Sequence, residues 1–119
     1  MNYRQRIGQF GEMLAKKYLV KHGYKIIATN VKNSYQEIDI IAQKQLWFVF
    51  IEVKTRTSMN LGSADMAMTS QKVSHLKKAI SNYIDINKID ENYIRLDLIS
   101  VDIKRFEKVA KIKHYKDII

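Results

Sequence analysis

The feature that most constrains the fold of this chain is a pair of apolar runs that stand close together. Residues 37–42 and 46–54 are rich in Ile, Val and Phe, and only a short polar break separates them. Runs of this length and composition are typical of β-strands, and a short polar loop between two of them favours an antiparallel hairpin. In the longer run, apolar residues occupy both faces, which predicts a central strand covered on both sides.

Charged residues interrupt these two runs at a few positions. Glu37 and Asp39 lie in the first, and Glu52 and Lys54 lie near the end of the second. Because side chains alternate between the faces of a strand, each pair is expected to share one face of its strand. Adjacent strands would then bring three acids and a lysine together at the rim of the core, which is the geometry of a site.

The overall charge indicates a polyanionic partner. The chain has 119 residues, enough for one domain spanning 1–119, and a net charge of +9. Nucleic acid is the first expected partner and an acidic membrane surface the second. The alternative is a soluble basic protein whose charge serves no polyanionic partner. Residues 1–60 hold ten Lys or Arg, and their only acids are Glu12, Glu37, Asp39 and Glu52.

Composition also excludes several classes of protein. Without cysteine the chain has no disulfide framework or thiolate metal site, and its three histidines have no zinc spacing. No apolar run approaches the roughly 20 residues of a membrane span, and no apolar stretch follows the basic N-terminus as in a secretory signal. We therefore expect a cytoplasmic protein, and we expect any metal to be hard and bound by oxygen.

The rest of the chain predicts an α/β protein. Helical spacing of apolar residues predicts a helix over 7–22 that carries Glu12 and ends at Gly23, and a second helix over 70–84. An irregular segment over 55–69 is the expected place for a mobile loop above the site. Further strands are expected at 24–29, 93–103 and 109–115. This order predicts a mixed α/β or α+β sandwich.

The clustered acids suit metal-assisted hydrolysis of a phosphodiester. Asp39 and Glu52 can meet at one Mg²⁺ or Mn²⁺ ion, with the Val53 backbone carbonyl as a third ligand. Lys54 can orient the attacking water or contact the scissile phosphate. Glu12 can complete the site directly or through water, and Glu37 is either a further ligand or a group that hydrogen-bonds a ligand.

Taken together, these residues resemble a known pattern. Asp39 and Glu52-Val-Lys54, with Glu12 on a preceding helix, resemble the PD-(D/E)xK nuclease superfamily. The whole chain resembles the YraN-type (UPF0102) family of small bacterial proteins, which are grouped with Holliday junction resolvase-like endonucleases. The matching segments are Gly8-Gln-Phe-Gly-Glu12-Met-Leu-Ala15, Gly23-Tyr24, Asn30, Glu37-Ile-Asp39-Ile-Ile41, Phe50-Ile-Glu52-Val-Lys54-Thr-Arg56, Gly62-Ser-Ala64, Lys72 and Arg95-Leu-Asp97.

The resemblance implies a restriction-endonuclease-like α/β/α core with a central mixed sheet of four to five strands flanked by helices. It also implies Mg²⁺ at Asp39 and Glu52, Lys54 as the catalytic lysine and Glu12 as the helical acid. The chain departs from the pattern at three positions. Gln36 replaces a usual glycine, Lys32 replaces arginine, and Ile38 stands where the superfamily has proline.

Three functions remain open from the sequence. The first is a metal-dependent nuclease that acts on DNA rather than RNA, of branched or recombination type, for which a homodimer would fit. The second is a nucleic-acid-binding module on a nuclease-like fold, and the third is a protein-interaction subunit with structural ion pairs. Arg56 and Lys72 are the candidates for phosphate contact. Arg95 with Asp97 is interpreted as a structural ion pair, and His75 and His114 as surface residues.

Overall fold

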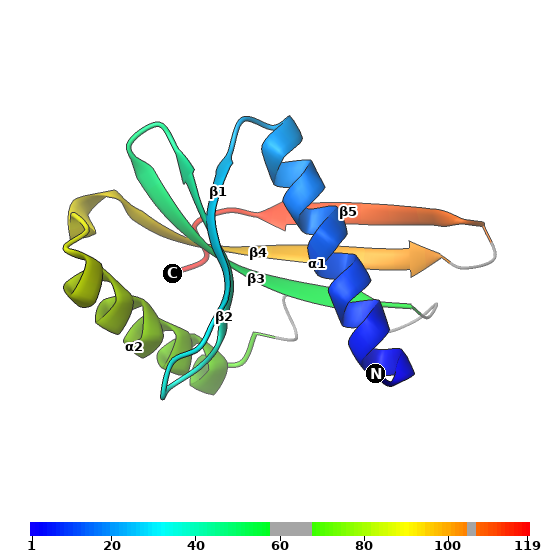
Figure 1. Ribbon diagram of the computed structural model, residues 1–119, viewed down its shortest axis with the longest axis horizontal. Helices are drawn as coiled ribbons and strands as arrows, with labels where there is room; N and C mark the ends of the chain where they lie inside the picture. The colour runs from blue at the N-terminus through cyan, green and yellow to red at the C-terminus, as the bar shows by residue number, and fades with distance from the viewer. Residues whose placement is uncertain (58–67, 105–106) are drawn as a thin grey trace.

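The computed structural model describes residues 1–57, 68–104 and 107–119 as one mixed sheet with helices packed against it (Figure 1). The strand order is β1-β2-β3-β4-β5, and only the β3–β4 pair is parallel. The strands are β1 (Lys25–Val31), β2 (Ile38–Lys44), β3 (Trp47–Arg56), β4 (Ile94–Lys104) and β5 (Val109–Tyr115). The helices are α1 (Tyr3–Lys21), α2 (Ser70–Asn87) and the short 3₁₀ helix η2 (Glu91–Tyr93).

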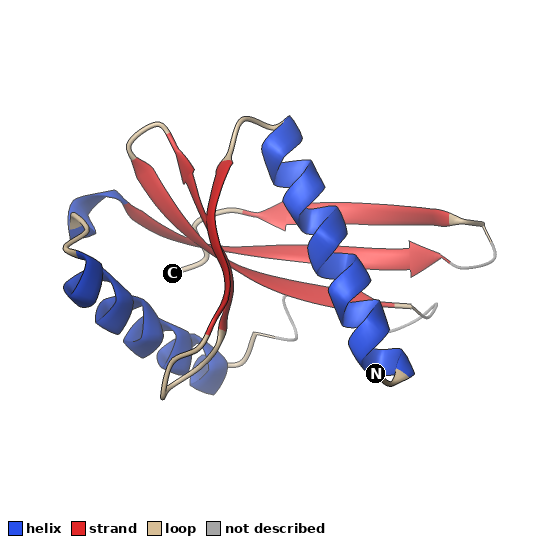
Figure 2. Ribbon diagram, in the orientation of Figure 1, coloured by secondary structure: helices blue, strands red, loops and turns tan. Residues whose placement is uncertain are grey.

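Two apolar clusters place the two long helices on opposite faces of the sheet. Ala15 and Leu19 of α1 pack with Val49 and Ile51 of β3, whereas Leu76 and Ile80 of α2 pack in the cluster that contains Phe50. Because neighbouring residues of a strand point to opposite faces, β3 is the central strand covered on both sides. This α/β/α arrangement, with helices and strands coloured separately in Figure 2, confirms the predicted fold class, and the mixed sheet has five of the four to five strands expected.

Helix α1 begins four residues earlier than predicted. Asn2 caps it, since its side chain accepts the Gln5 backbone N–H at 2.8 Å while the Gln5 side chain accepts the Asn2 N–H at 3.1 Å. This capping box satisfies backbone groups without any apolar residue, so apolar spacing could not locate the first turn. At the other end, Gly23 has a φ of +90°, as expected for a glycine that follows a helix.

The hairpin formed by β2 and β3 is antiparallel, as predicted, with Ile40 opposite Ile51. Strand β3 continues into the segment predicted to be irregular, because parallel pairing with β4 sets Thr55 opposite Val101 and Arg56 opposite Asp102. The remainder of the predicted loop falls mainly on 58–67, outside the residues that the structure describes. The longer strand therefore includes both Lys54 and Arg56, which are two residues apart.

Gly11 sets the distance between α1 and β3. It is buried, and a Cβ added there would overlap the Thr55 Oγ1 and lie 2.7 Å from the Thr55 Cβ. Contacts under 3.0 Å require a shift, and here the obstacle is a β-branched side chain on a central strand. Glycine therefore allows the helix to approach the sheet and fixes the position of Glu12, the next residue.

We expect Gly11→Ala to destabilise the protein by about 1–3 kcal/mol, the usual cost of overpacking. Gly8→Ala in the same helix is the matched control, since no atom lies within 4 Å of its added Cβ. That control should be neutral or should gain up to about 1 kcal/mol from helix propensity. Urea denaturation of both variants measures the difference, and equal effects would contradict close packing at Gly11.

Candidate active site

One cleft of about 500 Å³ lies where α1, β2, β3 and the start of α2 meet. Every residue predicted from the sequence as part of the site lines this cleft, although the residues come from four separate parts of the chain. They are Glu12, Glu37, Asp39, Glu52, Val53, Lys54, Arg56 and Lys72. Tyr3 and Arg4 also line the cleft; they were missed because the first turn of α1 was not predicted.

Asp39 is the second residue of β2, and its side chain reaches the neighbouring strand β3. Its Oδ2 accepts the Val53 backbone N–H at 2.9 Å. Strand alternation breaks here, because Ile38 packs in the α2 cluster whereas Ile40 packs in the α1 cluster. Burial, hydrogen bonding to Glu52 and the charge of Glu52 raise the pKa of Asp39 to about 9, against the lowering effect of the Val53 hydrogen bond. The site therefore disfavours two ionised carboxylates unless a cation lies beside them.

Glu52 is the buried acid of the cleft, with 3% of its surface exposed. Its Oε2 receives no hydrogen bond in the described part of the chain, although the Lys72 Nζ lies 2.9 Å away. A cation at this distance stabilises the carboxylate by charge, but without hydrogen-bond geometry it leaves the oxygen lone pairs open. Lys72, predicted as a phosphate contact, is thus an ion-pair partner of Glu52, a pairing that the 20-residue separation did not reveal.

Glu12 and Glu37 share a donor that the sequence reasoning did not assign. The Asn30 Nδ2 donates to the Glu12 Oε1 at 2.8 Å, and it lies 3.4 Å from the Glu37 Oε1, at the long end of hydrogen bonding. The charge of Glu12 also contributes to the raised pKa of Asp39. These contacts connect the helical acid to the acids of the hairpin.

Lys54 differs from the charged residues described above in its contacts. Its ammonium group forms no ion pair or hydrogen bond within the described residues, yet the side chain lines the same cleft as Asp39 and Glu52. An ammonium group without a protein partner can contact an anionic ligand or a water molecule. The geometry therefore leaves the predicted catalytic lysine available.

The donor set fits a hard divalent cation. Asp39 and Glu52 supply carboxylate oxygens, one of them buried without a hydrogen bond, and Mg²⁺ is usually held by one or two carboxylates while keeping several waters. Within the described residues, no three His, Cys, Asp or Glu side chains form a metal-holding group.

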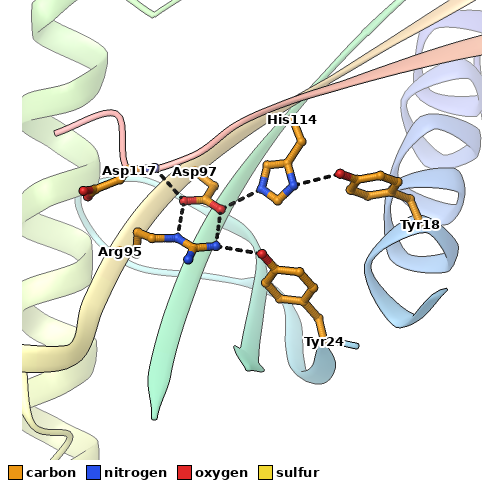
Figure 3. A network of polar contacts seen from close by, with 6 residues as sticks. All are labelled: Tyr18, Tyr24, Arg95, Asp97, His114 and Asp117. Atoms are coloured by element: carbon orange, nitrogen blue, oxygen red, sulfur yellow. Dashed lines mark hydrogen bonds and ion pairs between the residues drawn. The ribbon is translucent and has the colours of Figure 1, made fainter. Parts of the chain in front are cut away.

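A second polar cluster lies outside the cleft (Figure 3). Asp97 is completely buried, and its carboxylate accepts hydrogen bonds from Arg95 at 2.9 Å, from the His114 ring at 2.6 Å and from the Asp117 backbone N–H at 2.9 Å. The other ring nitrogen of His114 lies 3.0 Å from the Tyr18 hydroxyl. The predicted Arg95–Asp97 ion pair is confirmed.

The interpretation of His114 as a surface residue is wrong, since its side chain is only 4% exposed. Strand register explains this, because β5 pairs His114 with Ile99, a residue of the α1-side core. The face of the strand that meets α1 is therefore the face that carries His114.

The fold and the cleft together define a class, an α/β/α protein with paired carboxylates and a lysine at the ends of adjacent strands. Sequence comparison gives the family: the profile described as "Uncharacterised protein family UPF0102" matches residues 11–101, and the chain belongs to this family. A UPF0102 protein of Caldicellulosiruptor bescii is 39% identical over 118 residues, covering 98% of each chain. The UPF0102 protein FP2501 of Flavobacterium psychrophilum is 42% identical over 111 residues, covering 93% of this chain and 91% of the relative.

Among solved structures, the chain is similar to SfsA of Pyrococcus furiosus, solved in complex with Ca²⁺, with a TM-score of 0.41 and 11% identity. The match covers 94% of this chain and spans 63% of that one. No helix in the described ranges 1–57, 68–104 and 107–119 has the length and apolar character needed to cross a membrane.

Proposed function

We propose that this protein is a metal-dependent nuclease that hydrolyses phosphodiester bonds in DNA, with branched or recombination-type DNA as its substrate and the cytoplasm as its location. The observation that carries the proposal is the meeting of Asp39, buried Glu52 and Lys54 in one cleft. Acids at a polyanion-binding surface repel phosphate unless a cation lies between them. The net charge of +9 supports nucleic acid as the partner.

In this proposal, Asp39, Glu52 and the Val53 carbonyl hold Mg²⁺ or Mn²⁺. When bound, such an ion would lower the pKa of water and stabilise charge on the phosphate. Lys54 holds the scissile phosphate or orients the attacking water, since its ammonium group is uncommitted in the described residues. Arg56 lines the same cleft and contacts a neighbouring phosphate. The buried position of Glu52 keeps bulk water from competing for its oxygens.

A second candidate function is a nucleic-acid-binding module with weak or no catalysis. One observation favours it: Lys72 already supplies a positive charge 2.9 Å from the Glu52 carboxylate, so the acid is neutralised in part without metal. Under this alternative, the basic residues bind DNA and the carboxylates only hold Lys72 in place.

The test is nicking of a four-way junction, a flap and a linear duplex in the presence of Mg²⁺. We expect wild type to cut a branched substrate and Lys54→Ala to cut it at least about 100-fold more slowly, the usual cost of removing a group that stabilises transition-state charge. Lys77→Ala, an exposed lysine of α2, is the matched control with the same net charge and should retain activity. Salt-sensitive binding without cleavage of any substrate would favour the binding module.

A further inference from the structure

Asn30 joins two acids that come from different parts of the chain. Glu12 belongs to α1 and Glu37 directly precedes β2, yet one amide group, the Asn30 Nδ2 of β1, lies 2.8 Å from the first and 3.4 Å from the second. Two like charges that approach each other tend to separate in the absence of a shared donor. A single side chain therefore counteracts repulsion between two carboxylates at the cleft.

The backbone of Asn30 is also unusual. Its φ is +50°, in the left-handed region, which asparagine adopts more readily than most other non-glycine residues. An alanine would strain this backbone, a glycine would fit it without a donor, and an aspartate would tolerate it while replacing the donor with a negative charge. The position thus allows the backbone role and the side-chain role to be separated by substitution.

The cavities around Glu12 and Glu37 show on which side of the two carboxylates Asn30 lies. Glu12 and Glu37 line both the candidate active-site cleft and a neighbouring groove of about 920 Å³, whereas Asn30 lines only the groove. Asn30 contacts the Oε1 atom of each acid. The amide thus bonds one oxygen of each carboxylate from the groove side, and the second oxygen of each takes no part in these bonds.

We propose that Asn30 is a positioning residue that holds Glu12 and Glu37 toward the active-site cleft. The inference rests on the proposed nuclease function, because a fixed Glu12 acts on the metal ion and the reacting groups that this function places in the cleft. Asn30 itself does not contact the reacting atoms. Groups that orient a metal site indirectly in this way typically change metal affinity or activity by 10–100-fold when they are removed.

The first test compares Asn30→Gly with the wild-type chain. We expect Asn30→Gly to bind Mg²⁺ about tenfold more weakly in calorimetric titration. At saturating Mg²⁺ its kcat should fall about tenfold, with KM for DNA within about twofold. Asn30→Asp should lose at least as much Mg²⁺ affinity and kcat, since aspartate tolerates the left-handed backbone but adds a third negative charge. Asn33→Gly is the matched control and should change neither quantity, because Asn33 bonds Asn82 at 3.0 Å on the α2 side.

The second test asks whether Asn30 acts through Glu12. In a Glu12→Gln background, Asn30→Gly should cause little further loss, since coupled residues give non-additive effects in a double-mutant cycle. As a readout independent of activity, the NMR signal of the Asn30 side-chain amide should shift in Glu12→Gln but not in Glu91→Gln, which changes an exposed acid elsewhere.

The outcomes separate the two proposals. Additive losses, or Mg²⁺ affinity and kcat unchanged in Asn30→Gly while wild type binds and cleaves, would overturn the positioning role alone. A wild-type chain that binds Mg²⁺ but cuts no DNA would overturn the nuclease proposal, and the Mg²⁺ affinities then decide the role of Asn30. If wild type binds no Mg²⁺, the NMR signal of the Asn30 amide decides whether the hydrogen bond to Glu12 exists. A signal that does not shift in Glu12→Gln overturns the hydrogen bond, and a signal that shifts supports it.

Discussion

Asp39→Asn is expected to weaken Mg²⁺ binding at least about 100-fold and to abolish cleavage, while the metal-free protein becomes more stable. The carboxylate is one of two that can hold the ion, and an amide oxygen carries no charge to replace it. Burial and the neighbouring Glu52 raise the pKa of Asp39, which means that the ionised form is disfavoured without metal. Asparagine removes that cost and can still accept the Val53 N–H.

Calorimetric titration and thermal unfolding in EDTA measure the two effects. We expect the metal-free Tm to rise by about 4 °C, which corresponds to roughly 1 kcal/mol in a domain of this size. Asp85→Asn, an exposed acid of α2, is the matched control and should change neither quantity. Equal Mg²⁺ affinity in wild type and Asp39→Asn would exclude Asp39 as a ligand, and a lower metal-free Tm would contradict a cost of burying this carboxylate beside Glu52.

The hairpin could be predicted because its information is local. Alternation along β3 determines that Val49 and Ile51 face one helix while Phe50 and Glu52 face the other, and no distant contact is needed to read this. On β3 the same alternation places Glu52 and Lys54 on one face. Around Asp39 the alternation breaks, yet the structure still brings Asp39 into the cleft that Glu52 and Lys54 line. Sheet order, by contrast, depends on the parallel pairing of β3 with β4, two strands that are separated in sequence by α2.

The parts that were missed depend on contacts between distant residues. The Lys72–Glu52 ion pair joins α2 to β3, and the Asn30 bonds join three elements at once. His114 was misjudged because its face is decided by the register of β5 against β4, which no residue near His114 encodes. Charge and periodicity in the sequence are therefore enough to locate the site. Which residue pairs with each charged side chain depends on the three-dimensional fold.

Asp97→Asn is expected to destabilise the protein by about 3–5 kcal/mol at neutral pH, the usual cost of removing one partner of a buried ion pair. The carboxylate is completely buried, and asparagine would leave Arg95 and His114 beside a neutral group with one acceptor oxygen instead of two. The effect should extend to the end of the chain, because the Asp117 backbone N–H bonds the same carboxylate at 2.9 Å. Urea denaturation at pH 7 measures the loss.

Low pH should remove the difference in unfolding free energy between wild type and Asp97→Asn. Burial acts to raise the pKa of Asp97, but hydrogen bonds from His114, Arg95 and the Asp117 amide, with the charge of Arg95, hold it below its ordinary value. A depressed pKa means that the stabilisation is fully present above the unfolded-state value of about 3.9 and is lost as pH falls through the lower folded-state value. The gap in unfolding free energy should therefore persist at pH 5 and shrink below about pH 4. Asp102→Asn on the same strand is the control, and a gap that stays constant down to pH 3 would show that the loss comes from packing rather than from the carboxylate charge.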